Sequence, residues 1–97
     1  FPMTPGLLTL HLHLPACRSL KEKRSRLKPL LARLHREFNV SVAEIDLQDV
    51  WQSAVIGCAL LTSDRASTTR QLQAIVAWVE TYWPDVDVEG EEIELLG

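Results

Sequence analysis

The sequence predicts a single α+β domain whose elements follow the order β-α-β-β-α-β. Three observations support this class: strict apolar alternation near the N-terminus, two long amphipathic helical patterns, and two further strand-like segments joined by a polar turn. The 97 residues fit one domain, and 46% apolar with 24% charged residues is ordinary for a folded chain. We therefore expect one core, without a repeat, a linker or a second domain.

The first strand is predicted for residues 7–14. Leucine occupies every even position of this stretch, whereas Thr9, His11 and His13 occupy odd positions. Because side chains alternate between the two faces of a strand, we expect only the leucine face to be buried. Pro15 ends the pattern.

A long first helix is predicted for residues 19–37. It begins with a capping box, Ser19-x-x-Glu22. Pro29 interrupts the helical pattern but points away from the apolar stripe, so a bend there is convex toward water and the freed carbonyl can bind solvent. We predict one kinked helix whose apolar stripe contains Leu20, Leu27, Leu30, Leu31, Leu34 and Phe38.

The second half of the chain predicts a hairpin, a second helix and a last strand. Strands at 39–47 and 51–62 flank a polar turn, and the latter is apolar on both faces, as is typical of a central strand. Ser63 or Asp64 can cap the second helix, which Pro84 closes. Residues 86–95 carry an acidic run around Gly90, which indicates an edge strand guarded by charge and bent by a bulge.

With right-handed crossovers, this order gives the ferredoxin-like two-layer sandwich, an antiparallel four-stranded sheet with both helices on one face. The first and third strands then lie in the centre, and the other face of the sheet stays open. We expect Trp51, Val55 and Leu61 on the open face beside the strand-one histidines. The opposite parity of strand three would bury Trp51 instead.

Three ordered motifs resemble the YlxP-like family of small bacterial proteins of unknown function: SLKEKR at 19–24, FNVSVAE at 38–44 and DLQDVWQ at 46–52. The resemblance covers nearly the whole chain and is weakest in the acidic last strand. It implies a ferredoxin-like fold, no established activity or cofactor, and genes that often neighbour those for ribosome-binding factor A, initiation factor two and a transcription factor. These gene neighbours favour an RNA- or ribosome-linked role but assign no role to any residue.

The charge of the chain is strongly asymmetric. Eight of its ten Lys and Arg residues lie between positions 18 and 36, whereas twelve of thirteen acids lie from position 37 onward. Cations at a helix start oppose the helix dipole, but beside free N–H groups they can seat phosphate. We therefore predict contact with the backbone of ribosomal or other structured RNA. The candidate residues are Arg18, Lys21, Lys23, Arg24, Arg26, Lys28, Arg33 and Arg36.

Alternatives to this RNA hypothesis stay open. The basic helix is also compatible with a solvated surface, with small anions or with acidic protein partners. The acidic second half of the chain and the lack of regular aromatic pairs on the open sheet count against a large RNA interface.

The open sheet face supports a second hypothesis, because monomers seldom expose an apolar patch. We expect a homodimer or the docking of another protein through His11, His13, Trp51, Val55 and Leu61. A small-ligand regulatory domain is a third option, for which the sequence names no ligand. Trp78 and Tyr82 are assigned to packing beside the core stripe of the second helix.

No motif predicts catalysis, a metal or a cofactor, and we expect a non-enzymatic binding module. His11 and His13 share a strand face near Cys17, but a zinc site usually needs three or four ligands. Acidic residues at 44, 46 and 49 fit a hairpin turn better than a catalytic pair. The four glycines are scattered, so the sequence contains no glycine-rich phosphate loop.

Two further features indicate the compartment of the protein. No apolar run approaches the roughly 18 residues of a membrane span, and a signal-type N-terminus is lacking, so we expect a cytoplasmic protein. Cys17 and Cys58 form no CxxC pair and are expected to be free thiols. Phe1 and Pro2 precede Met3, which resembles a natural start, so we interpret them as a remnant of protein expression and assign the domain to residues 3–97.

Overall fold

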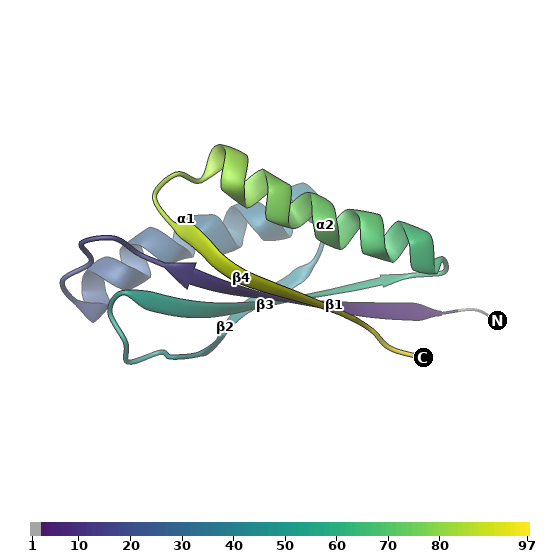
Figure 1. Cartoon of the computed structure of the whole chain (residues 1–97), viewed down its shortest axis with the longest axis horizontal. Coiled ribbons are helices and arrows are strands. Elements are labelled where there is room, and N and C mark those ends of the chain that lie inside the picture. The colour runs from purple at the N-terminus through teal and green to yellow at the C-terminus, as the bar shows by residue number, and fades with distance from the viewer. Residues whose placement is uncertain (1–2) are drawn as a thin grey trace.

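The computed structural model describes residues 3–97, and the expectation for Phe1 and Pro2 lies outside the described residues. Residues 3–97 form six elements in the predicted order (Figure 1). They are β1 Thr4–His13, α1 Leu20–Phe38, β2 Ser41–Asp46, β3 Ser53–Thr62, α2 Arg65–Tyr82 and β4 Asp87–Leu95. The fold is the ferredoxin-like α+β sandwich that the sequence predicts.

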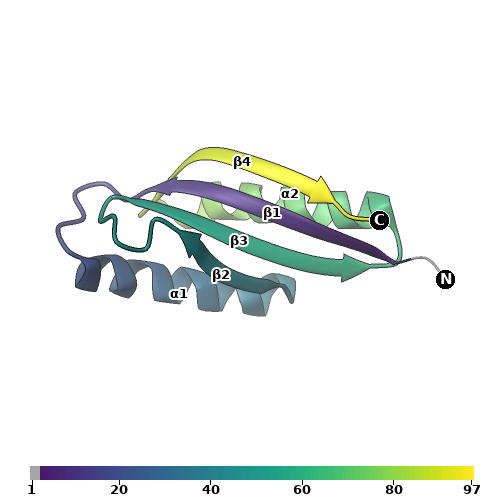
Figure 2. The ribbon, with the colours of Figure 1, turned by 90° about the horizontal axis from the view of Figure 1, so that it is seen from below.

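The sheet has the strand order β2-β3-β1-β4, with every neighbouring pair antiparallel. β1 and β3 pair along ten positions, from Thr4↔Thr62 to His13↔Ser53. Both helices cover the same face of the sheet, and Figure 2 shows the strands in front of them with the other face uncovered. Within residues 3–97, no helix is long and apolar enough to cross a membrane.

Local signals set the helix ends. The Ser19 side chain accepts a hydrogen bond from the Glu22 N–H at 3.0 Å, and Asp64, one of the two predicted caps, accepts from the Ser67 N–H. α1 stays continuous through Pro29, which lies on the exposed side as expected. Asn39 ends α1 in the left-handed conformation, with φ of 51°.

The core lies between the helices and the sheet. The even-numbered leucines of β1 are buried together with the apolar stripes of both helices. Gly6 lets α2 approach β1, because an added Cβ would clash with the side chains of Thr68 and Leu72. The burial of the even-numbered leucines of β1 therefore depends on the close packing of α2 against this strand.

Two bulges shape the edges of the sheet. In β4 the partner of β1 changes from Gly90 to Val88 between His11 and Leu12, so Glu89 is an extra residue. This bulge is close to the predicted one at Gly90. A second bulge at Ile45 of β2, between the pairs Glu44↔Ile56 and Asp46↔Val55, was not predicted.

The boundaries of the hairpin differ from the prediction. β3 begins at Ser53 instead of residue 51, so Trp51 lies exposed in the β2–β3 loop and belongs to neither strand face. The parity of strand three therefore does not decide the position of Trp51. Val55 pairs with His11 and faces the open side, yet its side chain is buried.

Candidate functional site

The cations of α1 divide into two groups, and Lys23 belongs to the interior. The residue is only 1% exposed. Lys23 Nζ donates to the backbone carbonyls of Leu47 and Val50, both at 2.7 Å, and lies 2.7 Å from Glu44 Oε2. The ammonium group therefore has two hydrogen-bonded carbonyls and one carboxylate in an ion pair around it. The prediction of Lys23 as an RNA contact is corrected: the residue fastens the β2–β3 loop to α1.

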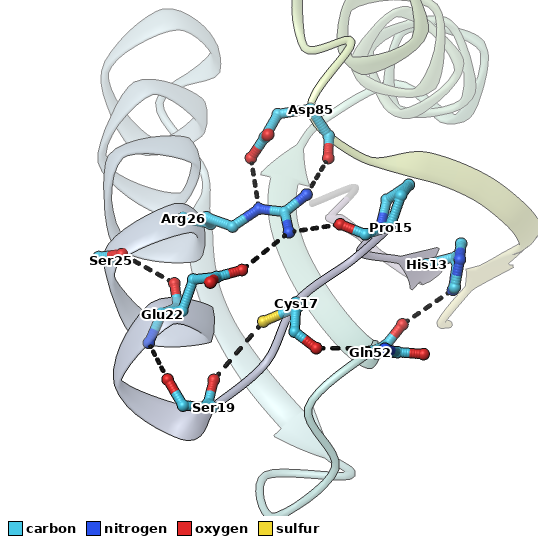
Figure 3. A network of polar contacts seen from close by, with 9 residues as sticks. All are labelled: His13, Pro15, Cys17, Ser19, Glu22, Ser25, Arg26, Gln52 and Asp85. Atoms are coloured by element: carbon cyan, nitrogen blue, oxygen red, sulfur yellow. Dashed lines mark hydrogen bonds and ion pairs between the residues drawn. The ribbon is translucent and has the colours of Figure 1, made fainter.

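Arg26 is also committed to internal partners, as Figure 3 shows. Arg26 Nε donates to Asp85 Oδ2 at 2.8 Å and a terminal nitrogen donates to the Asp85 carbonyl, while Nη1 donates to the Pro15 carbonyl at 2.8 Å. The hydrogen bond with Asp85 raises the pKa of Arg26 above its ordinary value. Arg26 therefore ties α1 to the loops after β1 and α2, a second correction to the candidate set.

Arg33 is partly engaged. Its guanidinium lies 5.5 Å from the centroid of Trp78 and 3.2 Å from Glu37 Oε1. Trp78 stacks on Trp83 at 5.9 Å and meets the edge of Phe38 at 5.9 Å. The contact between Phe38 of α1 and Trp78 of α2 joins the two helices. Tyr82, next to Trp78, is by contrast 65% exposed.

The remaining cations lie in water on the outer side of α1 and in the loop before it. Lys21, Arg24 and Lys28 fall within a sector of about 60° on the helix. The two acids of α1, Glu22 and Glu37, are paired with Arg26 and Arg33. The ion pairs found within residues 3–97 involve none of the exposed group. We call this group the basic strip: Arg18, Lys21, Arg24, Lys28 and Arg36.

The open sheet face carries a second surface, which is apolar. Leu61 is 60% exposed and Ile45 52% exposed, and Leu7 is also exposed. Leu7, Ile45 and Gly57 line a hollow of about 380 Å³, whereas Leu61 lies on the same face near the end of β3 and does not line it. An added Cβ at Gly57 would lie 3.1 Å from Ile45, so glycine lets Ile45 lie across β3. We call this surface the apolar patch: Leu7, Ala43, Ile45, Gly57, Ala59 and Leu61.

His11 and His13 lie on the polar half of the open sheet face. His11 Nε2 is 2.8 Å from Glu92 Oε1, and His13 Nδ1 is 3.0 Å from the Gln52 carbonyl and 3.6 Å from Glu89 Oε1. The structure therefore separates the predicted interface set. Leu61 belongs to the apolar patch, whereas Trp51 lies in a loop and Val55 is covered.

Comparison with known proteins identifies the family. A family described as "Protein of unknown function (DUF503)" matches residues 6–92. The chain belongs to the DUF503 family. The protein described as "Uncharacterized protein YlxP" of Bacillus subtilis (strain 168) is 42% identical over 69 residues, which are 71% of this chain and 74% of that protein. The resemblance to the YlxP-like family is thereby confirmed.

Solved structures show the fold of this DUF503 chain alone. The de novo designed protein Foldit4 aligns with a TM-score of 0.50 at 13% identity, covering 96% of this chain and 97% of its own. SnoaB, described as a cofactor-independent oxygenase from Streptomyces nogalater, aligns with a TM-score of 0.44 at 12% identity, over 100% of this chain and 93% of its own. The latter likeness is too distant to carry any argument.

Both candidate surfaces lie within the DUF503 match. The basic strip, from Arg18 to Arg36, and the apolar patch, from Leu7 to Leu61, fall inside residues 6–92. The acidic end of β4 extends past this range. The two surfaces are thus parts of the DUF503 domain itself.

The cysteines of this DUF503 chain are buried and free. Cys17 Sγ donates to the Ser19 carbonyl at 3.5 Å. Burial raises the pKa of the Cys58 thiol to about 11, so the thiol is protonated at neutral pH and is a poor nucleophile. Among residues 3–97, no group of three or more His, Cys, Asp and Glu side chains is placed to hold a metal ion.

Sequence reasoning missed two features of these surfaces. The helical wheel does place Lys23 inside the leucine stripe, between Leu27 and Leu30, which is a usable signal for burial. The exposure of Ile45 depends on the β2 bulge and on the absence of a side chain at Gly57. No periodic pattern in the sequence indicates that arrangement.

Proposed function

We propose that this DUF503 protein is a non-enzymatic binding module that contacts the phosphate backbone of ribosomal or other structured RNA through the basic strip. The observation that carries the proposal is the division of the α1 cations. Lys23, Arg26 and Arg33 have internal partners, whereas the strip is exposed and remains outside the ion pairs of residues 3–97.

The dimensions of the strip suit a nucleic-acid backbone. At a rise of 1.5 Å per residue, Lys21 and Arg36 are about 22 Å apart along the helix axis. Long, flexible cationic side chains over such a distance can contact several phosphates, and contacts of this kind need charge more than exact geometry. Within α1 the charge of the strip is not cancelled, since the two acids of this helix are paired with Arg26 and Arg33.

The proposed RNA contact involves the α1 side of the molecule and not the β4 edge of the sheet. β4 carries five acidic residues and lies at the opposite edge of the sheet from β2, so that edge repels a polyanion. The neighbouring genes implied by the YlxP-like resemblance support a ribosomal RNA partner. The proposal places the protein in the cytoplasm, where that RNA is found.

Binding to ribosomal subunits and to total cellular RNA across a salt series tests the proposal. The strip variant combines Lys21→Glu, Arg24→Glu and Lys28→Glu, all at exposed positions. We expect affinity to fall with salt, and each lost phosphate contact to lower the slope of log affinity against log salt by about one. Reversals at Arg26 or Arg33 are unsuitable, because they would also break internal contacts.

A matched pair of single variants provides the control. Arg24→Glu and Arg70→Glu make the same charge change at exposed positions of α1 and α2. The proposal requires Arg24→Glu to weaken RNA binding several-fold more than Arg70→Glu. Equal losses in the two variants, or binding that does not depend on salt, would remove the strip from the function.

A further inference from the structure

Trp51 is the largest side chain that the β2–β3 loop exposes to water. The residue is 51% exposed, although tryptophan is highly buried on average in folded proteins. The aromatic ring pairs found within residues 3–97 all involve Trp78, and none of them includes Trp51. Packing within this chain therefore does not account for the position of the Trp51 indole.

The backbone on the N-terminal side of Trp51 is held by α1. The Val50 carbonyl, which belongs to the peptide bond before Trp51, accepts from Lys23 Nζ at 2.7 Å. The same ammonium group binds the Leu47 carbonyl, to which the Val50 N–H also donates at 2.9 Å. Leu47 has a φ of 59°, a left-handed conformation that is rare for leucine, and its N–H donates to Asp46 Oδ1. Such strain persists only where the surrounding contacts over-determine the backbone, so the loop is held in a defined conformation.

Gln52 holds the backbone on the other side of Trp51. Its carbonyl accepts from the Leu14 N–H at 2.9 Å and lies 3.0 Å from His13 Nδ1. Its side-chain amide donates to the Cys17 carbonyl at 3.2 Å, as Figure 3 shows. Because both neighbours of Trp51 are tied to other elements, the backbone beneath the indole loses little further freedom when a ligand binds.

The anchors of the loop adjoin the N-terminal end of the basic strip. Lys23 directly precedes Arg24 in the chain, and Cys17 directly precedes Arg18. Figures 1 and 2 both show the β2–β3 loop beside the first turn of α1. The exposed indole of Trp51 and the first cations of the strip therefore lie at the same end of the molecule.

The acidic residues of the loop limit what can bind there. Asp46 and Asp49 are exposed, whereas Glu44 is paired with Lys23. Two exposed carboxylates repel phosphate from the loop itself, while the strip attracts phosphate to α1. An uncharged planar group carried by a polyanion meets both conditions. A nucleobase can lie against the indole while the phosphates of neighbouring nucleotides lie along α1.

Stacking on an indole requires a base with a free face. The bases of a continuous RNA helix are stacked on their neighbours, and side chains cannot read its deep, narrow major groove. Bases in loops, bulges and single strands can instead be splayed out and stacked on aromatic side chains. Because every base has such a face, this contact tolerates any sequence. The exposed indole therefore fits an unpaired base and not a duplex.

We propose that the Trp51 indole stacks on an unpaired base of the RNA whose phosphates the basic strip contacts. This inference rests on the proposed function of the strip. It narrows the ligand to RNA with a loop, a bulge or a single-stranded segment next to the contacted backbone. The strip supplies the salt-dependent part of the affinity, and Trp51 adds a contact that releases no counterions.

Two RNA probes with the same number of phosphates test the inference: a hairpin with an unpaired loop and a continuous duplex. We expect the wild-type protein to bind the hairpin more tightly. Trp51→Ala should weaken hairpin binding by about five- to a hundredfold and should have little effect on duplex binding. The slope of log affinity against log salt should stay at the wild-type value in Trp51→Ala, whereas the strip variant lowers it.

Three further variants serve as controls. Tyr82→Ala removes another exposed aromatic side chain, 65% exposed on α2, and should leave hairpin affinity unchanged. Trp51→Phe keeps an aromatic ring and should retain most of the affinity. Trp51→Leu keeps only the apolar character and should lose as much as Trp51→Ala. Circular dichroism shows which variants fold, and the comparison of Trp51→Phe with Trp51→Leu still tests stacking if Trp51→Ala does not fold.

Three results would overturn the stacking contact. If Trp51→Ala binds the hairpin as tightly as the wild type while the strip variant loses affinity, the indole makes no contact and the function proposed for the strip stands without it. If Trp51→Leu binds as tightly as Trp51→Phe, the side chain acts as an apolar contact, which suits a protein partner. If neither probe binds in a salt-dependent way, the strip is removed from the function and the stacking contact with it.

Discussion

Lys21 and Lys23 lie two positions apart in the first turn of α1, yet one is in water and the other is 1% exposed. A weaker form of this contrast separates Arg24, which is exposed, from Arg26, which is partly buried. Two residues correspond to a rotation of about 200° around the helix, which moves a side chain from the solvent side to the side of the core. The number of cations on a helix therefore does not show which of them can bind a partner and which stabilise the fold. Each side chain must first be assigned to the solvent side or to the core side of the helix.

The two sides make different physical demands. A buried ammonium loses several kcal/mol of hydration and persists only where nearby acceptors replace the water. Lys23 obtains its acceptors from β2 and from the β2–β3 loop, 21 to 27 positions along the chain. Lys21 keeps its hydration and stays available for a phosphate.

The largest expected effect is on the buried side. Lys23→Ala should lower the free energy of unfolding by about 3 to 5 kcal/mol, because it leaves Glu44 and two carbonyls without their cation. Denaturant unfolding measures this loss. Lys21→Ala should change stability by no more than about 0.5 kcal/mol.

A double variant sharpens this comparison. Lys23→Met combined with Glu44→Leu should cost less than Lys23→Ala alone, since no unpaired charge remains. If Lys23→Ala and Lys21→Ala proved equally mild, the distinction between the two sides of α1 would fail.

The pKa of the Cys58 thiol depends on how well the helix-covered side of the sheet excludes water. Its pKa is raised by burial from 9.0 to about 11. The folded thiol therefore keeps its proton where the unfolded thiol loses it, and stability should fall by about 2 to 3 kcal/mol as pH rises from about 9 to about 11. Chemical denaturation at several pH values measures the slope, and Cys58→Ala should remove this part of it. An unchanged slope in Cys58→Ala would mean that water reaches the thiol.

The smallest effect concerns the partly buried arginine. Arg26→Met should cost about 1 to 2 kcal/mol, because the contacts with Asp85 and the Pro15 carbonyl are lost while the apolar stem is kept. Arg24→Met, the matched exposed variant, should stay within about 0.5 kcal/mol. RNA affinity should show the opposite ranking, with Arg24→Met the more harmful. Thermal and denaturant unfolding, paired with RNA titration, decide whether stability and binding separate in this way.

Much of the fold is predictable because it depends on local patterns. Even-numbered leucines in β1, the Ser19 and Asp64 caps and the acidic run near Gly90 each act over a few residues, and the structure has the corresponding strand, helix starts and bulge. The sequence indicates only part of the division between the buried and the exposed cations of α1. The wheel angle of Lys23 indicates burial, but neither its acceptors nor the Asp85 partner of Arg26 can be found from spacing.

The sequence by itself determined the order of the elements, the helix boundaries, the buried face of β1 and the concentration of positive charge in one helix, because periodicity and capping are properties of neighbouring residues. Only the tertiary structure decided which cations are free, that Trp51 lies in a loop, and that Ile45 lies over Gly57 on an open apolar face. Those outcomes depend on pairings between distant residues and on single-residue bulges that shift a strand's register, and a local pattern contains no information about either.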